Sequence, residues 1–465
     1  MMLAVPFIYF SFLGLYMYRK RKKIDLAILI CIIYAISGFV GLFMGDPGER
    51  VKGYHISVIA AVSYCALLTM CLFPIAKFSH LGIKSISPVK NEKLLRALSW
   101  AAIIWFLIFV IGSWSQFHGI ITGDMLALRT ALYNGTADDS YIVSMPFPIR
   151  FILSSFSYIF GCYWILIFLA FYCLLIQKLP IKYFLFFLIA SLSCPWGAVL
   201  GIDRSAVAGY LFSFAGIVVF FWPFMQKKIR RWTVILGSVI IGALIAYLAV
   251  ITISRFGGVK GDDMEGVNNS LLFYIGHSYL YFCYYFDNFD NPAKMLNLIF
   301  PFISKFVFGS EVLGGMRINA YLESKVGGDY GYFYTFLGQI QITAGHIVMI
   351  VFCILFFIIS NNLLSKRKHG MVTPRYAFLY FFFASFMLLG LFAYFYQSPT
   401  ITASVVSFLI FFKMLGVRKV NQVKRSHIVN NCNVTEYVKQ NCESPEKPQA
   451  RDGADSGHEI IKTAE

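Results

Sequence analysis

The sequence predicts an all-α fold, a polytopic helical bundle of about eleven transmembrane helices with one large outer loop. Of the 465 residues, 58% are hydrophobic and only 14% are charged, whereas soluble domains carry about 25% charged residues. Apolar stretches of about 20 residues, the length that crosses a bilayer as a helix, recur along the whole chain. Basic residues gather in short clusters between these stretches. Together these observations indicate a protein that crosses a membrane many times.

Hydropathy and charge together divide residues 1–416 into eleven expected spans. They fall at 3–18, 25–45, 55–76, 98–118, 150–176, 183–201, 205–225, 233–253, 332–360, 376–396 and 400–416. Residues 417–465 are polar and lack apolar periodicity, which predicts a disordered tail. No small-residue cleavage site follows the first apolar segment, so no cleavable signal peptide is expected.

The net charge of +17 raises the question of a nucleic-acid partner, but the placement of the charge argues against one. The basic clusters lie at 19–23, 77–96, 227–231, 366–368 and 413–425. All of them fall on one side of the membrane if the N-terminus is outside, which is the positive-inside pattern. We therefore expect a multi-pass membrane protein with a cytoplasmic C-terminus and no nucleic-acid partner.

The ten cysteines are scattered and form no CxxC pair. Most lie within apolar spans, so neither a disulfide framework nor a zinc site is expected. No metal and no cofactor are predicted.

Two segments on the expected outer side are longer than connections need to be, 119–149 and 254–331. The first carries apolar residues at the spacing of a short amphipathic helix on the membrane surface, from Leu126 to Leu132. The second alternates polar turns with aromatic runs, which predicts short helices at the membrane interface. An additional pair of spans within this second loop is the alternative.

The predicted spans contain almost no ionisable residues, and His346 is the clearest exception. Proton-coupled transporters usually carry such groups within the bilayer, so their scarcity argues against transport and directs attention to the outer face. There "VLGIDRSAVAGYLF" (199–212) puts Asp203 and Arg204 on a tight hairpin between two spans. A guanidinium offers paired donors shaped for phosphate. Arg204 at headgroup depth could therefore hold a lipid diphosphate, with Asp203 orienting it; a solvated turn with a local ion pair is the simpler interpretation.

Three further outer arginines are candidates for binding the same diphosphate: Arg129, Arg255 and Arg317. For Arg255 the alternative is an anchor that extends to the membrane surface from a span end. For Arg129 and Arg317 the alternative is an ordinary position on a solvated surface. Candidates for a general base, which would accept a proton from a sugar hydroxyl, are outer histidines and acids. His277 is the first choice and Asp203 the second, followed by His55, His118, Asp124, Asp287 and Asp290.

Three short stretches and the layout of spans resemble the O-antigen and capsular polysaccharide polymerases (Wzy type). The stretches are "GIDRSAVAGYLF" (201–212), "ISRFGG" (253–258) and "YFYTFLGQIQITAG" (332–345), and the likeness in layout covers about residues 1–420. The resemblance implies an all-helical fold related to that of O-antigen ligases. It also implies that oligosaccharide repeat units carried on undecaprenyl diphosphate are joined at the outer face of the cytoplasmic membrane, facing the periplasm or exterior. Neither a nucleotide sugar nor a metal is then required.

The resemblance further implies that arginines in outer loops are functional, some in a pattern of Arg, ten residues, Gly. Arg255 with Gly266 and Arg317 with Gly328 have that spacing, although both fall in one loop rather than two. The expected partners are the lipid-linked oligosaccharide, membrane lipid, and a chain-length regulator and flippase of the same pathway. Direct displacement would invert the anomeric carbon. The alternatives are an O-antigen ligase, a flippase or exporter of lipid-linked oligosaccharide, and a structural or assembly protein.

Overall fold

The computed structural model describes residues 2–44, 51, 53–122, 146–201, 205–256, 263–288, 299, 304, 335–367, 370–392 and 394–417. All of them belong to the first of two compact units, Met1–Arg418; the second is Lys419–Glu465. The predicted surface helix at Leu126–Leu132, most of the large outer loop beyond 288 and the polar tail lie outside the described residues.

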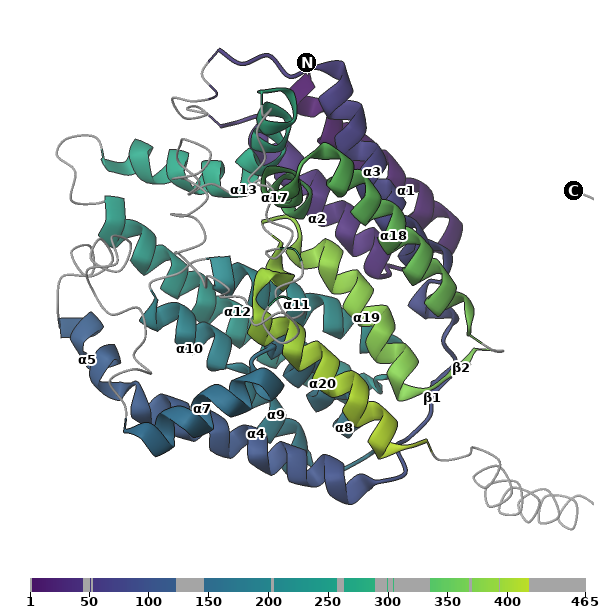
Figure 1. Ribbon diagram of the computed structural model, residues 1–465, viewed down its shortest axis with the longest axis vertical. Helices are drawn as coiled ribbons and strands as arrows, with labels where there is room; N and C mark the ends of the chain where they lie inside the picture. The colour runs from purple at the N-terminus through teal and green to yellow at the C-terminus, as the bar shows by residue number, and fades with distance from the viewer. Residues whose placement is uncertain are drawn as a thin grey trace, which may run out of the picture. The chain divides into compact units, whose positions relative to one another are not determined.

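The described chain is helical apart from one short pair of strands (Figure 1). Its helices are α1 (Val5–Arg21), α2 (Leu26–Gly41), α3 (Val58–Lys77), α4 (Glu92–Gly112), α5 (Trp114–Thr122), α7 (Phe147–Phe160), α8 (Tyr163–Leu175), α9 (Ile181–Ser191), α10 (Ser193–Leu200), α11 (Ser205–Phe221), α12 (Lys227–Phe256), α13 (Asp263–Asn288), α17 (Thr335–Ala344), α18 (His346–Ser365), α19 (Pro374–Leu389) and α20 (Pro399–Leu415). Short 3-10 helices are η1 (Met2–Ala4), η2 (His80–Gly82), η3 (Trp222–Phe224) and η4 (Phe395–Gln397). Strands β1 (Ser85–Ile86) and β2 (Met371–Val372) pair in parallel.

Seven helices among the described residues are long and apolar enough to cross a membrane, and the bent pair α7–α8 makes up to eight. They are Met2–Arg21, Val58–Gly82, Glu92–Gly112, Ile181–Leu200, Ala206–Phe224, Lys227–Tyr247 and His346–Ser365. The apolar helices α2, α19 and α20 are shorter, at 10 to 17 residues. An all-helical membrane protein is therefore confirmed, whereas the count of eleven spans stays a prediction.

Several expected spans are interrupted, and two of the breaks adjoin a glycine. The stretch predicted as 150–176 is bent by 65° between α7 and α8. At the bend a Cβ on Gly161 would lie 2.4 Å from the carbonyl oxygen of Ser157 and 2.6 Å from the γ-methyl of Thr400, so a larger residue would not fit without a shift. The stretch predicted as 332–360 breaks into α17 and α18 at Gly345, whose φ of 94° is unfavourable for residues with a side chain.

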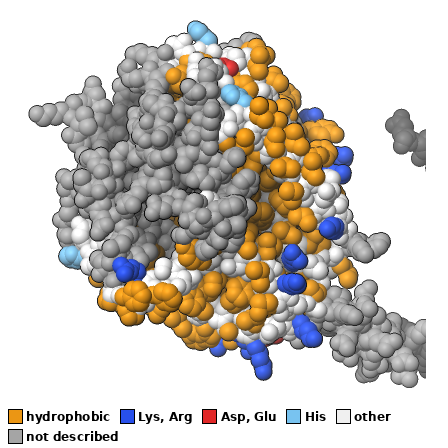
Figure 2. All heavy atoms as spheres, viewed as in Figure 1, with side chains coloured by type: hydrophobic (Ala, Val, Ile, Leu, Met, Phe, Trp, Pro, Cys, Tyr) orange, Lys and Arg blue, Asp and Glu red, His pale blue; other side chains and the backbone are white. Residues whose placement is uncertain are grey.

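The helix ends that carry basic clusters meet at one end of the bundle, which we call the basic end. Arg21 at the end of α1 donates to the carbonyl oxygen of Ala76 in α3. Arg367, after α18, donates to the carbonyl oxygen of Ser79 at 3.0 Å. The β1–β2 pair joins the segment after α3 to the segment before α19. In Figure 2 most of the visible blue Lys and Arg side chains follow the lower right edge. The positive-inside prediction makes this end cytoplasmic.

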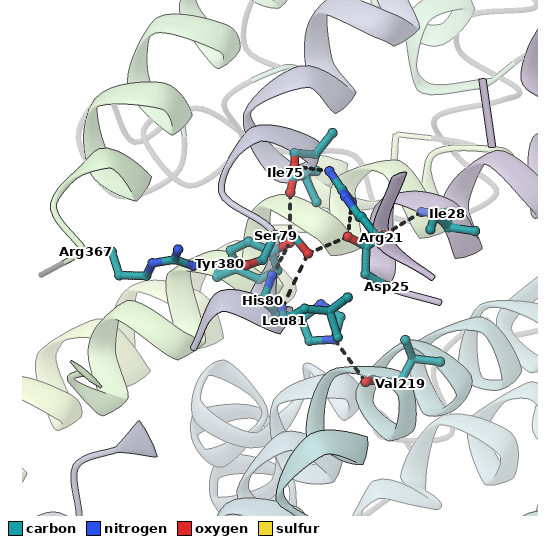
Figure 3. Close-up of polar contacts among 11 residues, drawn as sticks. Arg21, Asp25, Ile28, Ile75, Ser79, His80, Leu81, Val219, Arg367 and Tyr380 are labelled. Atoms are coloured by element: carbon teal, nitrogen blue, oxygen red, sulfur yellow. Dashed lines mark hydrogen bonds and ion pairs between the residues drawn. The ribbon is translucent and has the colours of Figure 1, made fainter. Parts of the chain in front are cut away.

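A buried polar network organises the basic end (Figure 3). Asp25, which is 0% exposed, caps α2 by accepting a hydrogen bond from the backbone N–H of Ile28 at 3.0 Å. The same carboxylate pairs with Arg21 and accepts the hydroxyl of Ser79. Since a buried carboxylate is costly unless it is paired and hydrogen-bonded, this network ties the α1–α2 turn to the end of α3.

Aromatic side chains fill the centre of the bundle and apolar side chains cover its flank. Trp164 and Phe168 of α8 pack against Phe378 and Phe381 of α19, with ring centroids 5.3 to 6.2 Å apart. Large apolar residues are exposed on α1, α3, α4, α12 and α18, and orange side chains dominate the described surface in Figure 2. Such an apolar band fits contact with lipid rather than water.

Candidate functional site

The end of the bundle opposite the basic end, here called the outer end, holds the candidate site. Asp203 and Arg204 lie in the turn between α10 and α11, outside the described residues, and so do Arg129 and Arg317. The backbone of Arg255 is described, in the last turn of α12. Of the six residues proposed for catalysis or diphosphate binding, the structure describes the side chain of His277 alone. Helices on either side of the others are described.

The helices that flank the Asp203–Arg204 turn are in contact with their neighbours at the outer end. The amide of Gln116 in α5 donates to the carbonyl oxygen of Leu200, the last residue of α10, at 3.4 Å. The hydroxyl of Tyr247 in α12 donates to the carbonyl oxygen of Ala198 at 3.2 Å. Contacts continue from α10 to α11, from α11 to α12 and from α12 to α13. The elements that carry or flank Arg204, Arg255 and His277 therefore form one continuous row.

An aromatic shelf, formed by Trp114, Phe117 and Trp196, adjoins this row. The rings of Trp114 and Trp196 are nearly parallel at 6.2 Å, and Phe117 lies 4.6 Å from Trp196. The indole N–H of Trp196 donates to the hydroxyl oxygen of Ser113 at 2.8 Å, which fixes the ring. Trp114 is 55% exposed. Trp196 is about 80 positions from the other two in the chain, so its proximity to them was not predicted from the sequence.

Helix α13 packs closely against the outer ends of α1, α2 and α3. A Cβ on Gly276 would lie 2.6 Å from the backbone of Gly41, so both glycines are needed for this approach of α13 to α2. The hydroxyl of Tyr279 donates to the carbonyl oxygen of Met2 at 3.2 Å. The aromatic run in the large outer loop thus forms a helix, as expected, and α13 is not among the helices that qualify as spans.

His277 lies inside this packing and is 1% exposed. Its ring stacks on Phe273, with centroids 4.4 Å apart, and meets Tyr281 edge to face at 5.5 Å. Its Nδ1–H donates a hydrogen bond to the carbonyl oxygen of Phe273. Burial lowers the pKa of His277 from 6.5 to about 4, because an imidazolium is costly away from water. These contacts are those of a neutral, packed side chain and favour Asp203 over His277 as the base.

The lowered pKa predicts a pH-dependent stability. Below about pH 6.5 the unfolded chain binds a proton at His277 that the folded chain does not bind until about pH 4. The contribution of His277 is therefore complete above pH 6.5 and is lost as the pH falls to about 4. Thermal unfolding of the detergent-solubilised protein between pH 7.5 and 4.5 should show a fall in melting temperature that His277→Phe reduces. An identical fall in the variant would show that His277 is not buried and neutral.

Asp287, another predicted base candidate, is committed to hydrogen bonds in the described structure. Its carboxylate accepts the hydroxyl of Ser57 at 2.7 Å and the backbone N–H of Ser57 at 3.2 Å. It also accepts the hydroxyl of Tyr54. Ser57 is the N-cap of α3, where a negative charge is favourable. The position of Asp287 therefore indicates a structural role in holding α13 to the start of α3.

Two glutamines of "GQIQITAG", Gln339 and Gln341, are buried in α17 and were not among the predicted site residues. The side-chain amide of Gln341 donates a hydrogen bond to the carbonyl oxygen of Tyr285 at 2.7 Å. The ring Nε2–H of His346 donates one to the carbonyl oxygen of Phe286 at 2.9 Å. Both carbonyls belong to the last turn of α13 and would otherwise have no partner within the helix. The Oε1 of Gln339 accepts the backbone N–H of Tyr394 at 2.6 Å. Two glutamines in an apolar stretch were the available signal.

The described residues do not bring together any group of three His, Cys, Asp or Glu that could hold a metal ion. No protein-family model, no curated protein and no solved structure matches the chain.

Proposed function

We propose that this protein polymerises oligosaccharide repeat units carried on undecaprenyl diphosphate, at the outer face of a bacterial cytoplasmic membrane. The supporting observation is the continuous row of α10, α11, α12 and α13, in which the Tyr247–Ala198 hydrogen bond joins α12 to α10. Arg204 is in the turn between the first two helices, and Arg255 is in the last turn of the third. The proposal rests on this arrangement and on the resemblance of the sequence to Wzy-type polymerases.

In the proposed reaction the growing glycan leaves its lipid diphosphate and is transferred to the non-reducing end of a new lipid-linked unit. Cleavage of the glycosyl–phosphate bond places negative charge on the departing diphosphate. Guanidinium groups fixed near it stabilise that charge more in the transition state than in the ground state, which accelerates the reaction. We assign this role to Arg204 and Arg255, with Arg129 and Arg317 as further contributors.

The attacking sugar hydroxyl needs a base, and the buried, neutral state of His277 leaves Asp203 as the preferred candidate. A single displacement inverts the anomeric carbon. Comparison of the anomeric configuration in the lipid-linked donor and in the polymer tests this step, and retention of configuration would exclude it.

The aromatic shelf is suited to bind a sugar ring of the lipid-linked substrate, since an aromatic face packs well against the C–H groups of a pyranose. We predict that Trp114→Ala raises the KM for the lipid-linked unit about three- to tenfold, the range expected for one aromatic contact. The matched control is Trp100→Ala, which removes an indole of similar exposure (48%) on α4. Kinetics in proteoliposomes measure both, and equal KM values for the two variants would show that the shelf does not contact substrate.

The lipid-linked glycans of a deletion strain test the function as a whole. A polymerase predicts that single repeat units accumulate on the lipid carrier and that longer chains are lost. Full-length chains that are never attached to their acceptor would instead indicate a ligase. A flippase predicts charged residues along a central cavity, but the charged residues of the described spans lie near the helix ends. Units that accumulate on the cytoplasmic leaflet would favour the flippase nonetheless.

A further inference from the structure

A cavity at the basic end lies between the end of α18 and the start of α19. Its volume is about 420 Å³, and three basic residues line it: Lys366, Arg367 and Arg375. None of the described residues that line the cavity is acidic. The two ion pairs found among the described residues, Arg21–Asp25 and Arg96–Glu92, leave these three cations without a carboxylate partner. The lining therefore has a net positive charge.

The position of Arg367 is fixed by its contacts outside the cavity. Its Nη1 donates to the carbonyl oxygen of Ser79 at 3.0 Å. A Cβ on Gly82 would lie 2.4 Å from a nitrogen of the same guanidinium, so the glycine leaves room for it. These contacts set the orientation of the Arg367 side chain.

The start of α19 adds to the positive potential of the cavity. Thr373, the N-cap, accepts the backbone N–H of Tyr376 at 3.2 Å. Arg375 is in the first turn of this 16-residue helix, where the helix dipole favours a negative charge. The positive-inside rule explains why basic residues occur at this end. It does not explain why three of them converge on one cavity, since like charges repel at short range.

Most of the rest of the lining is apolar, with Leu363, Met371, Val372 and Leu379 beside Thr373 and Tyr376. Met371 is 46% exposed, and the helices on both sides carry exposed apolar residues. A small water-soluble anion would gain nothing from this part of the lining. A lipid with a phosphate headgroup and acyl chains would match both parts, as basic pockets at the cytoplasmic ends of transmembrane helices do.

We propose that this cavity binds the headgroup phosphate of an anionic phospholipid from the cytoplasmic leaflet. Lys366, Arg367 and Arg375 pair with the phosphate, and the acyl chains lie along α18 and α19. Bound lipid then holds the α18–α19 turn, and with it the β1–β2 pair, against the segment that follows α3. This site is independent of the proposed glycan chemistry at the outer end.

The test measures the thermal stability of the purified full-length protein in detergent with increasing phosphatidylglycerol, phosphatidylcholine or inorganic phosphate. We expect phosphatidylglycerol to raise the melting temperature in a saturable manner and the other two to have little effect. Arg375→Gln should weaken the apparent affinity for phosphatidylglycerol about fivefold or more, the loss expected for one basic contact. Lys413→Gln removes a cation from the last turn of α20 at the same end and should leave the affinity unchanged.

A second variant keeps every charge and changes the geometry alone. Gly82→Ala displaces the guanidinium of Arg367 and should also weaken phosphatidylglycerol binding. Native mass spectrometry of the wild-type protein gives a test that does not depend on the folding of any variant. It should show phosphatidylglycerol retained on the protein. Equal affinity in wild type, Arg375→Gln and Gly82→Ala would overturn the proposal. So would stabilisation by inorganic phosphate equal to that by phosphatidylglycerol, which would indicate a free anion as the ligand.

Discussion

Replacement of Arg204 by alanine is expected to abolish glycan chain extension while the protein remains in the membrane at its normal level. A single fixed donor to the developing charge of a leaving group typically contributes a factor of about 10² to 10³ in rate. A loss of that size would remove visible polymer from a glycan gel. Gel profiles of the complemented deletion strain, together with immunoblots of its membranes, measure both quantities.

Two companion variants make this result specific. Arg204→Lys should also impair extension, because an ammonium group cannot form the paired hydrogen bonds of a guanidinium. Arg150→Ala should leave the ladder intact, because Arg150 lies at the start of α7 with its guanidinium 5.8 Å from the ring of Phe147. A normal ladder from Arg204→Ala would remove the centre of the proposed mechanism.

Replacement of Asp25 by alanine should have the largest effect on stability. The substitution leaves Arg21 and the hydroxyl of Ser79 without their shared partner and removes the N-cap of α2. Removing one partner of a buried pair typically costs about 3–5 kcal/mol. We therefore expect a markedly lower melting temperature and a lower yield of folded protein in detergent.

The matched control for Asp25→Ala is Glu92→Ala, which breaks the other i,i+4 ion pair, between Glu92 and Arg96. That pair is solvent-accessible, so its loss should change the melting temperature little. Asp25→Asn keeps an acceptor for the backbone N–H of Ile28 but loses the charge, and it should be intermediate. Equal effects of Asp25→Ala and Glu92→Ala would show that the buried network does not stabilise the basic end.

The helical bundle could be predicted because each span carries its own signal, an apolar stretch ended by basic residues. The interruptions could not, because they depend on neighbours that are distant in the sequence. The span 150–176 bends at Cys162, next to a glycine that Thr400 of α20 approaches, and nothing within 150–176 identifies that neighbour. Gly345 breaks the next such span through its positive φ, a conformation that the sequence permits but does not require.

The outer site was predictable only in part. Residue type made His277 a reasonable base, but its burial against Phe273 depends on how α13 packs on α2, through Gly41 and Gly276. Asp287 was a base candidate for the same reason, and its hydrogen bonds to Ser57 come from a segment 230 residues away. The aromatic shelf likewise joins distant parts of the chain.

Binding of undecaprenyl diphosphate to the purified protein tests the central claim most directly, that outer arginines hold a lipid diphosphate. The measurement compares the affinities of the wild-type protein, Arg204→Ala, Arg255→Ala and the double variant. The proposal predicts that each single variant binds at least about tenfold more weakly. It also predicts that the two losses do not add, because both side chains contact one diphosphate. Unchanged affinity in all three variants would contradict the claim.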